Sequence, residues 1–331
     1  MNFAVIGLGS MGKRRIRSLI SLGEKNIIGI DIREDRRKNS EAEYGIRTYE
    51  KLEDVQNMSE INAFIISVPP EMHMKYAHYA IDNNIHSFIE ASVVKDSMLE
   101  LIKKSETKPN IKVCPSCTLK FHPSIKLIKK IVDENGIGKL SNFSYHSGQY
   151  LPDWHPWEKI EDYYVSKRTT GACREIVPFE LTWLNWVFGE PNNVFGYKAR
   201  TIDLGVDIDD VYAITLQYNS GALGTLVVDV VSRVSTRKLT INGDNGQIFW
   251  DWNKKSVEVY DAIEKRLVIY GEPEGMAATG YNKNIIEEMY IDEIKSFIST
   301  IDGENTFPNS LVNDFQTLQY LYEIENSNLS M

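Results

Sequence analysis

The sequence predicts an α/β protein in which a parallel-sheet domain is followed by an α+β domain with a large, mostly antiparallel sheet. The first observation is a glycine-rich turn between an apolar run and a helical pattern within the first 25 residues. The second is an alternation of short apolar runs and helical patterns up to residue 118, which is typical of βαβ units. The third is a series of strands joined by hairpin turns between residues 193 and 271, which indicates an antiparallel sheet.

The glycine-rich turn reads Gly7-Leu8-Gly9-Ser10-Met11-Gly12. In a turn of this spacing the first glycine permits a tight bend, the second lets a pyrophosphate approach the backbone, and the third lets the helix pack on the strand. Backbone N–H groups at Ser10 and Met11 would face the phosphates. Asp31 follows about 20 residues downstream, where a carboxylate accepts hydrogen bonds from an adenosine ribose. We therefore predict a Rossmann dinucleotide-binding domain, with a ligand-free glycine turn as the alternative.

This first domain is expected to comprise residues 1–118. Parallel strands are predicted at 2–6, 27–32, 63–68, 87–90 and 111–114, and helices at 11–22, 71–84 and 96–106. In the first helix Ile16, Leu19 and Ile20 share one face, a spacing that buries this face against the sheet. Gly23 is a suitable C-cap for the same helix.

The second domain is expected to comprise residues 119–331. A helix is predicted at 123–134, a strand at 139–150, an irregular aromatic segment at 151–164 and a helix at 175–188. Strands follow at 194–200, 211–218, 222–231, 238–241, 247–252, 256–260 and 267–270, and helices at 284–301 and 311–324. We expect a ligand to lie between the domains, at the carboxyl ends of the parallel strands.

Composition excludes several other classes of protein. The net charge of −9 over 331 residues argues against an extended nucleic-acid surface. No apolar segment approaches the roughly 20 residues that cross a bilayer, and no signal peptide precedes the first strand, so we expect a cytoplasmic protein without membrane partners. Cys114, Cys117 and Cys173 lack the pattern of a disulfide framework or a structural zinc site. We predict no metal and interpret the cysteines as buried thiols, with a redox Cys-x-x-Cys pair as the alternative.

Basic residues cluster after the glycines and again after Asp31. The first cluster contains Lys13, Arg14, Arg15 and Arg17, and the second contains Arg33, Arg36, Arg37 and Lys38. Both clusters are interpreted as solvated helix faces, and contacts with phosphate or adenosine are the alternative.

Several motifs, taken in order, make the chain resemble the glucose–fructose oxidoreductase, inositol dehydrogenase and rhizopine-catabolism (Gfo/Idh/MocA) oxidoreductases. The resemblance covers nearly the whole chain. Its motifs are Val5-Ile-Gly-Leu-Gly-Ser-Met-Gly12, Ile66-Ser-Val-Pro-Pro-Glu-Met-His73, Phe88-Ile-Glu-Ala91, Lys120-Phe-His-Pro123, Gly171-Ala-Cys-Arg-Glu-Ile-Val-Pro-Phe-Glu-Leu-Thr-Trp183 and Phe188-Gly-Glu-Pro191. Leu151-Pro-Asp-Trp-His-Pro-Trp157 with Tyr163-Tyr164 is similar to a subgroup found beside genes for bacterial surface-sugar synthesis.

The resemblance implies a set of cofactor contacts at the ends of the parallel strands. Ser67, Pro69 and Pro70 would line the nicotinamide and its ribose, and His73 begins the helix that follows. An ordinary turn and helix start would also explain these residues. Glu90 matches the glutamate of the family's Glu-Lys-Pro motif. Arg33 completes the expected cofactor contacts, beside Asp31.

Two departures affect proton transfer. Ala91 stands where the family has the lysine of Glu-Lys-Pro, which contacts the substrate and helps to move a proton. In helix 175–188 the family pattern of Asp, His and Asp is replaced by Glu175, Phe179 and Thr182. Spacing of four and seven keeps these side chains on one helical face, but the imidazole that would accept the proton is gone.

Other residues are candidates for the missing role. We favour Lys120, Glu175 and Tyr163 as catalytic residues, with anion binding as the alternative for Lys120 and packing as the alternative for Tyr163. Substrate contacts are expected from aromatic, cationic and neighbouring side chains, with an oligomer contact as the alternative for the tryptophans and arginine. They are Ala91, Lys120, His122, Trp154, Trp157, Arg168 and Phe179.

These features predict an NAD(H)-dependent oxidoreductase that acts on a sugar or sugar derivative, with a surface-sugar pathway as the implied context. Asp31 favours NAD because a carboxylate repels a 2′-phosphate, while the arginines beside it keep NADP open. A catalytically silent family member that binds dinucleotide or sugar as a sensor or subunit is the alternative. We expect the free face of the antiparallel sheet to form a homodimer or homotetramer.

Overall fold

A computed structural model describes residues 1–154, 159–275, 277 and 284–327. The chain forms two compact units. The first contains residues 1–118 and 287–316, and the second contains residues 119–286 and 317–331. Residues 287–316, which we had assigned to the second domain, therefore lie in the first unit.

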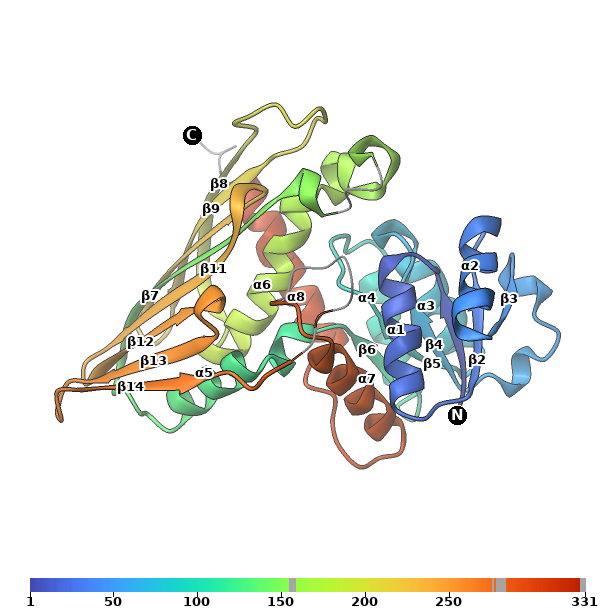
Figure 1. Cartoon of the computed structure of the whole chain (residues 1–331), viewed down its shortest axis with the longest axis horizontal. Coiled ribbons are helices and arrows are strands. Elements are labelled where there is room, and N and C mark those ends of the chain that lie inside the picture. The colour runs from blue at the N-terminus through green and yellow to red at the C-terminus, as the bar shows by residue number, and fades with distance from the viewer. Residues whose placement is uncertain (155–158, 276, 278–283, 328–331) are drawn as a thin grey trace. The chain divides into compact units, whose positions relative to one another are not determined.

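The first unit is built on a parallel sheet, as predicted, but the sheet has six strands and not the five expected (Figure 1). Its strands are β1 (Asn2–Ile6), β2 (Asn26–Ile30), β3 (Arg47–Tyr49), β4 (Ala63–Ile66), β5 (His86–Ile89) and β6 (Val113–Pro115). Their order in the sheet is β3-β2-β1-β4-β5-β6. This is the doubly wound Rossmann order, in which the direction of winding reverses between β1 and β4. A dinucleotide binds at the carboxyl ends of these two strands.

Helices accompany this sheet. They are α1 (Ser10–Ser21), α2 (Glu34–Tyr44), α3 (His73–Asp82), α4 (Met98–Thr107) and α7 (Glu287–Ile301). Ile16 and Leu19 of α1 are fully buried, whereas Ile20 on the predicted apolar face is exposed. Helix α7 belongs here because Ile294 and Phe297 are fully buried, with the ring of Phe297 centred 5.8 Å from that of Phe88.

The second unit contains an eight-stranded sheet in the order β14-β13-β12-β11-β7-β10-β9-β8. The strands are β7 (Leu140–Tyr150), β8 (Pro191–Ala199), β9 (Val211–Tyr218), β10 (Leu223–Asp229), β11 (Val231–Gly243), β12 (Gly246–Asp251), β13 (Ser256–Asp261) and β14 (Arg266–Gly271). All neighbours are antiparallel except β7 and β10, which run parallel. The predicted mostly antiparallel sheet is confirmed.

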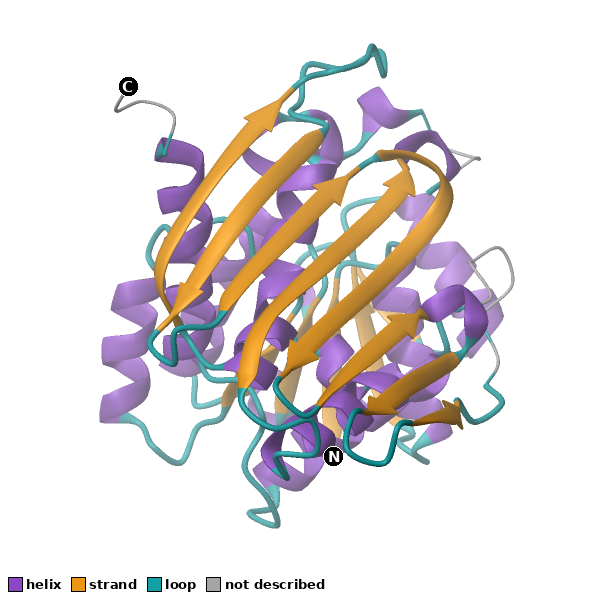
Figure 2. Ribbon diagram, turned by 90° about the vertical axis from the view of Figure 1, so that its left-hand side faces the viewer, coloured by secondary structure: helices purple, strands orange, loops and turns teal. Residues whose placement is uncertain are grey.

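One face of this sheet packs on α5 (Pro123–Asp133) and α6 (Ala172–Phe188), with α8 (Leu311–Asn326) nearby in the second unit from residue 317 onward. Alternate side chains such as Tyr145, Leu226, Ile241 and Trp250 are buried on the helix side. Figure 2 shows the other face toward the viewer, and no helix of the described residues covers it. None of the described helices has the length and apolar composition to cross a membrane.

A buried carboxylate joins α6 to the sheet. Glu180 accepts hydrogen bonds from the hydroxyls of Tyr145 and Ser147, both at 2.8 Å. It also accepts from Trp183 Nε1 at 2.7 Å and from Arg237 Nε at 2.9 Å. Because the carboxylate is fully buried, these donors replace its lost hydration and fix the rotation of α6 on the sheet.

Candidate functional site

The glycine turn has the geometry that its spacing predicts. Gly7 adopts φ +91°, and a Cβ there would lie 2.4 Å from the carbonyl oxygen of Ser67. A Cβ on Gly12 would lie 1.8 Å from the carbonyl oxygen of Gly7. These two glycines let β1, β4 and α1 approach one another closely. Around Gly9, in contrast, a Cβ would meet within 4 Å only the guanidinium end of Arg36.

The start of α1 can receive an anion. Gly9 is the N-cap, no side chain caps the helix, and the first turn contains no acidic residue. Backbone N–H groups at a helix start carry partial positive charge and lack partners within the helix. With the backbone around Gly9 clear of rigid atoms, this turn fits the pyrophosphate of a dinucleotide. Ser10 and Met11 open this helix, at the positions predicted for phosphate contact.

Asp31 follows directly after β2 and its carboxylate faces the glycine turn. Its Oδ2 accepts a hydrogen bond from the backbone N–H of Leu8, and its Oδ1 accepts one from the backbone N–H of Arg33, both at 2.8 Å. The Arg33 guanidinium pairs with Asp35 at 2.7 Å and is half-exposed. Asp31 therefore holds the turn against the end of β2, in addition to its predicted place beside the adenosine ribose.

Glu90 directly follows β5 and belongs to a buried charge cluster. Arg15 of α1 donates to both Glu90 oxygens, at 2.6 and 2.9 Å, and lies 2.8 Å from Glu293 of α7. The Ser67 hydroxyl donates to Glu90 Oε1 at 3.2 Å. Glu293 in turn accepts from Ser116, Cys117 and Thr118. Arg15 is fully buried, so the cluster fixes the Glu90 carboxylate at the end of the sheet.

The segment after β4 is held by His73. Pro69 and Pro70 lead into a 3₁₀ turn, Pro70–Met72, and His73 begins α3. His73 Nε2 lies 2.9 Å from the carbonyl oxygen of Val68, and burial lowers the pKa of the imidazole to about 4. The ring is therefore neutral near pH 7 and donates to this carbonyl, so it shapes the loop that starts at Ser67.

In the second unit, α6 presents a half-buried stripe. Glu175, Phe179, Thr182 and Trp186 are half-buried, whereas the residues between them are buried. Their spacing of four, three and four places them on one helical face, as predicted for the first three. Glu175 lies in the first turn, where the helix dipole stabilises a carboxylate.

Tyr164 reaches Glu175 from the neighbouring loop. The Tyr164 hydroxyl lies 2.9 and 3.0 Å from the two carboxylate oxygens of Glu175. The backbone of Tyr164 is held in turn, because the Thr170 hydroxyl donates to its carbonyl oxygen at 2.6 Å. Tyr163 stacks edge-on against Tyr164, with ring centres 6.2 Å apart. The structure thus brings Glu175, Tyr163 and Tyr164 together.

Lys120 and His122 lie on the segment that leads into α5. Both side chains are buried. The charge of Lys120 acts on the carboxyl group of Glu190. Burial raises the pKa of Glu190, and the hydrogen bond from the Tyr320 hydroxyl and the positive charge of Lys120 both counteract this rise. His122 is the N-cap of α5, with its ring 5.5 Å from that of Trp250 and Nε2 4.0 Å from Glu272. Burial lowers the pKa of His122 to about 3, so this imidazole is neutral near pH 7.

Comparisons with known proteins agree with this geometry. Residues 1–101 match the model of an oxidoreductase family with an NAD-binding Rossmann fold, and residues 125–249 match the GFO/IDH/MocA C-terminal domain. The chain belongs to the Gfo/Idh/MocA oxidoreductase family. Its NAD-binding Rossmann domain is the one that carries the glycine turn, Asp31 and Glu90. No curated protein is similar enough in sequence to match the chain.

Solved structures of low sequence identity share the fold over the whole chain. An oxidoreductase from Agrobacterium radiobacter in complex with NAD+, L-tartaric acid and magnesium has 13% identity and a TM-score of 0.88, covering 100% of this chain and 96% of its own. Myo-inositol 2-dehydrogenase from Lactobacillus plantarum has 18% identity and a TM-score of 0.82, with 99% and 97% covered. UDP-N-acetylglucosamine 3-dehydrogenase from Acidithiobacillus ferrooxidans has 16% identity and a TM-score of 0.79, with 99% and 97% covered.

The remaining predicted contacts lie in different surroundings. Ala91 is half-buried directly after Glu90. Trp154 is half-buried at the end of a short 3₁₀ turn, whereas Trp157 lies outside the described residues. Arg168 is half-exposed and pairs with Asp207 at 2.8 Å and with Asp209 at 3.2 Å. The Arg168 guanidinium is therefore held by two carboxylates.

The cysteines behave as buried thiols. Cys114, Cys117 and Cys173 are all buried and form no disulfide in the described part of the chain. Burial raises the pKa of Cys114 to about 12, and it raises the pKa of Cys173 well above its usual value. A thiol that stays protonated is a poor nucleophile, which argues against the redox alternative.

Sequence reasoning missed the partners of the basic cluster on α1. Arg14 and Arg15 were interpreted as solvated or phosphate-binding, but both are buried. Arg14 pairs with Glu287 at 2.8 Å, and Arg15 pairs with Glu90 and Glu293. The signal available in the sequence was their position one turn after the glycines, since Arg15 adjoins Ile16 on the buried face of the helix.

Proposed function

We propose that the chain is an NAD(H)-dependent oxidoreductase that oxidises or reduces a CH–OH group of a sugar or sugar derivative. The observation that carries the proposal is the glycine turn with Asp31 and Glu90 in an NAD-binding Rossmann domain of this family. Structural neighbours are named as dehydrogenases of levoglucosan, myo-inositol and UDP-N-acetylglucosamine, which supports a sugar-type substrate. The nucleotide-sugar neighbour favours a surface-sugar pathway, and we expect a cytoplasmic location, where NAD(H) is available.

Proton transfer in this proposal depends on Glu175 and its tyrosines. A bound nicotinamide supplies hydride transfer, and the chain must hold or move the hydroxyl proton. When an alcohol is oxidised, its hydroxyl proton passes to Tyr164 Oη while the Tyr164 proton passes to Glu175, which lies 2.9 Å away. Tyr163 and Lys120 complete the proposed catalytic set. Lys120 would stabilise negative charge on the substrate oxygen.

Substrate contacts are proposed from the residues that the sequence singles out for this role. Phe179 offers an aromatic face for sugar C–H groups, one turn after Glu175 on the half-buried stripe. Ala91 leaves space where the family lysine would stand. His122 would act as a neutral hydrogen-bonding group, and Trp154 with Trp157 as packing surfaces. Arg168 would have to exchange a carboxylate partner for the substrate.

The second candidate function is a catalytically silent family member. Ala91 and Phe179 replace both proton-carrying side chains that the resemblance leads one to expect, and this observation favours it. Such a protein would bind dinucleotide or sugar as a sensor or subunit without turnover.

A turnover assay separates the two functions. The purified protein is incubated with NAD+ or NADH and a panel of nucleotide-linked, phosphorylated and free sugars, and absorbance is followed at 340 nm. We expect turnover with at least one compound, a loss of about 100-fold in kcat for Glu175→Gln and about 10-fold for Tyr164→Phe. Glu161→Gln, an exposed carboxylate in the same loop, should change kcat less than twofold. Cofactor binding without turnover on any compound favours the silent candidate.

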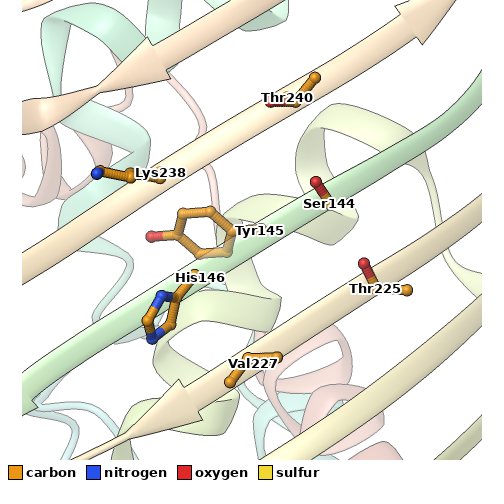
Figure 3. Close-up of a pocket in the computed structure, with 7 residues that line it drawn as sticks. All are labelled: Ser144, Tyr145, His146, Thr225, Val227, Lys238 and Thr240. Carbon is orange, nitrogen blue, oxygen red and sulfur yellow. The ribbon is translucent and has the colours of Figure 1, made fainter. Parts of the chain in front are cut away.

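We also propose that the open face of the second sheet pairs with a second copy of the chain. Strand register places Thr215, Thr225, Ser144 and Thr240 side by side across β9, β10, β7 and β11. Small hydroxyls leave a shallow depression of about 300 Å³ there, lined also by Val227, His146 and Lys238 (Figure 3). Around it lie exposed apolar side chains, among them Phe195, Tyr197, Leu223, Leu267 and Ile269.

Charge on this face suits a twofold arrangement. His146 lies 2.6 Å from Asp229, and Lys238 lies 3.6 Å from Asp251. A surface that carries both signs side by side can match its own copy across a twofold axis. The exposed apolar side chains supply the area that such an interface buries.

A further inference from the structure

We propose that Glu325, in the last turn of α8, is a positioning residue that holds Tyr164 against Glu175 and that acts through Arg174. This role rests on the proposed function, because Tyr164 and Glu175 are the groups that would move the proton. The segment that carries Tyr164, residues 159–171, is called the tyrosine loop below. The proton-transfer pair then depends on a helix end that lies about 150 residues further along the chain.

Arg174 joins α8 to the tyrosine loop. Its Nε and Nη2 donate to the two carboxylate oxygens of Glu325, at 2.8 and 3.1 Å. Its Nη1 donates to the carbonyl oxygen of Thr169 at 2.6 Å. Because the guanidinium is planar and rigid, the two bonds to Glu325 also set the direction in which the third donor points. Glu325 therefore aims Arg174 at the backbone of the loop.

The carboxylate of Glu325 is itself held in place. The hydroxyl of Tyr212, a buried residue of β9, donates to Glu325 Oε1 at 3.0 Å. The Arg174 guanidinium lies 5.0 Å from the centre of the Tyr322 ring, and only 8% of the arginine side chain is exposed. A bidentate pair that is shielded from water has one strongly favoured geometry, since opening it would leave two charges poorly solvated. The pair is thus a rigid anchor.

The tyrosine loop is tied to the same turn of α6 at two points. Arg174 binds the carbonyl oxygen of Thr169, and the hydroxyl of the next residue, Thr170, donates to the carbonyl oxygen of Tyr164 at 2.6 Å. The Tyr164 hydroxyl then returns to Glu175, at 2.9 and 3.0 Å from its two oxygens. Arg174 and Glu175 are neighbours in the first turn of α6. The backbone anchor at Thr169 therefore sets where the Tyr164 hydroxyl lies.

A second ion-pair group next to this anchor is exposed to solvent. Arg168 donates to both oxygens of Asp207, at 3.0 and 2.8 Å, and to Asp209 at 3.2 Å. About half of the Arg168 side chain and two thirds of the Asp207 side chain are exposed. Exposed pairs are screened by salt and contribute little to order. The shielded pair of Arg174 with Glu325 is therefore the stronger hold on the loop.

The first test is hydrogen–deuterium exchange of the full-length protein, read by mass spectrometry, which needs no substrate. Glu325→Ala should speed exchange of the amides at 163–170 at least 10-fold, because the loop opens more often, while β9 and β10 stay within twofold. Arg174→Lys keeps the charge but loses the planar fork, so an intermediate rate is expected. Glu323→Ala, which removes an exposed carboxylate from the same helix, is the matched control and should change no rate more than twofold.

The second test is kinetic and uses a substrate found in the turnover assay. Glu325→Ala should lower kcat about 10-fold, as Tyr164→Phe does, with KM within threefold. In a Tyr164→Phe background the same change should lower kcat less than twofold, because Glu325 acts through Tyr164.

Three results would overturn the role of Glu325: unchanged exchange of the loop in Glu325→Ala, equally faster exchange in β9 and β10, or a further 10-fold loss of kcat in the Tyr164→Phe background. Faster exchange confined to the loop, in a chain that turns over no compound, would overturn the proposed function and still support the hold of Glu325 on Tyr164.

Discussion

The side chain of Arg15 holds Glu90 in place at the carboxyl end of the parallel sheet, where the dinucleotide binds. It is fully buried between Glu90 of the strand end and Glu293 of α7, and its guanidinium lies 4.5 Å from the centre of the Phe88 ring. A buried cation paired with two carboxylates leaves strong uncompensated charge when it is removed. The position of Glu90 therefore depends on a residue of the glycine-turn helix.

Replacement of Arg15 by methionine should destabilise the first unit by about 3–5 kcal/mol, because Glu90 and Glu293 would remain buried without their cation. Urea unfolding followed by far-ultraviolet circular dichroism measures this loss. Arg17→Ala is the control, since Arg17 is partly exposed and lies 3.4 Å from Glu287, and it should cost less than about 1 kcal/mol. Equal losses for the two variants would contradict the role given to Arg15.

Acid should destabilise the protein through its buried histidines. Burial lowers the pKa of His73 to about 4, below the unfolded value of about 6.5. Between pH 6.5 and 4 the unfolded chain therefore binds a proton at this histidine, whereas the folded chain does not. The free energy of unfolding is therefore highest above pH 6.5 and decreases as the pH falls toward 4. His122 acts in the same direction, with a pKa lowered to about 3.

His73→Gln removes one of these groups and should reduce the slope of unfolding free energy against pH by up to about 1.4 kcal/mol per pH unit between pH 6 and 4.5. Urea titrations at several pH values measure the slope. His78→Gln, at a half-buried histidine on the same helix, is the matched control for the loss of one imidazole. A slope that is the same in His73→Gln and in the unchanged chain would contradict a neutral buried imidazole.

At the scale of residues, the sequence predicted the backbone geometry of the glycine turn better than the ion pairs around it. Gly7, Gly9, Gly12 and Asp31 follow from a local motif, because the spacing itself sets the backbone geometry. The pairing of Arg15 with Glu293 joins residues far apart in the chain, and no local pattern indicates it. The contact of Tyr164 with Glu175 likewise depends on how a loop folds back onto α6.

Among the elements, α1 and its glycines connect sequence to function most directly. Gly12 lies inside a helix, where alanine would otherwise be favoured, but a Cβ there would overlap the carbonyl oxygen of Gly7. Gly23 ends the same helix with φ +85°, and a Cβ there would meet nothing within 4 Å. The two glycines thus serve different purposes.

Gly12→Ala should weaken NADH binding at least 100-fold, because the turn must open to relieve the overlap. Gly23→Ala should leave NADH affinity within twofold while costing about 1 kcal/mol of stability through the left-handed backbone. Isothermal titration with NADH and thermal unfolding provide the two readouts. Unchanged NADH affinity in Gly12→Ala would contradict the proposed geometry of the turn.

Physical reasons explain why the sequence did not predict some of the elements or their place in the fold. Helix α2 buries only Ser40, so it has no apolar period to detect. Strand β3 has three residues, too few for an alternation. Helix α7 was predicted as a helix, but its return to the first unit depends on Phe297 meeting Phe88 and on the two arginines of α1.

For the molecule as a whole, the open face of the second sheet predicts self-association. Val227 lies at the centre of this face, beside His146 in the strand register. Val227→Glu should convert a dimer or tetramer to smaller species by placing a carboxylate in a desolvated interface. Sedimentation velocity measures the change. Ile263→Glu, at an exposed apolar residue in the turn between β13 and β14, should have no effect. A monomeric unchanged chain would contradict the self-association.

The central claim is that the glycine turn, Asp31 and Glu90, at the carboxyl ends of the parallel strands, bind a nicotinamide dinucleotide that serves as the cofactor of this protein. The most direct test is a fluorescence titration of the purified full-length chain with NADH. The account predicts a saturable signal with one site per chain and a dissociation constant in the micromolar range or below. Absence of saturable binding of NADH and of NADPH at millimolar concentration, in a chain shown to be folded by circular dichroism, would contradict it.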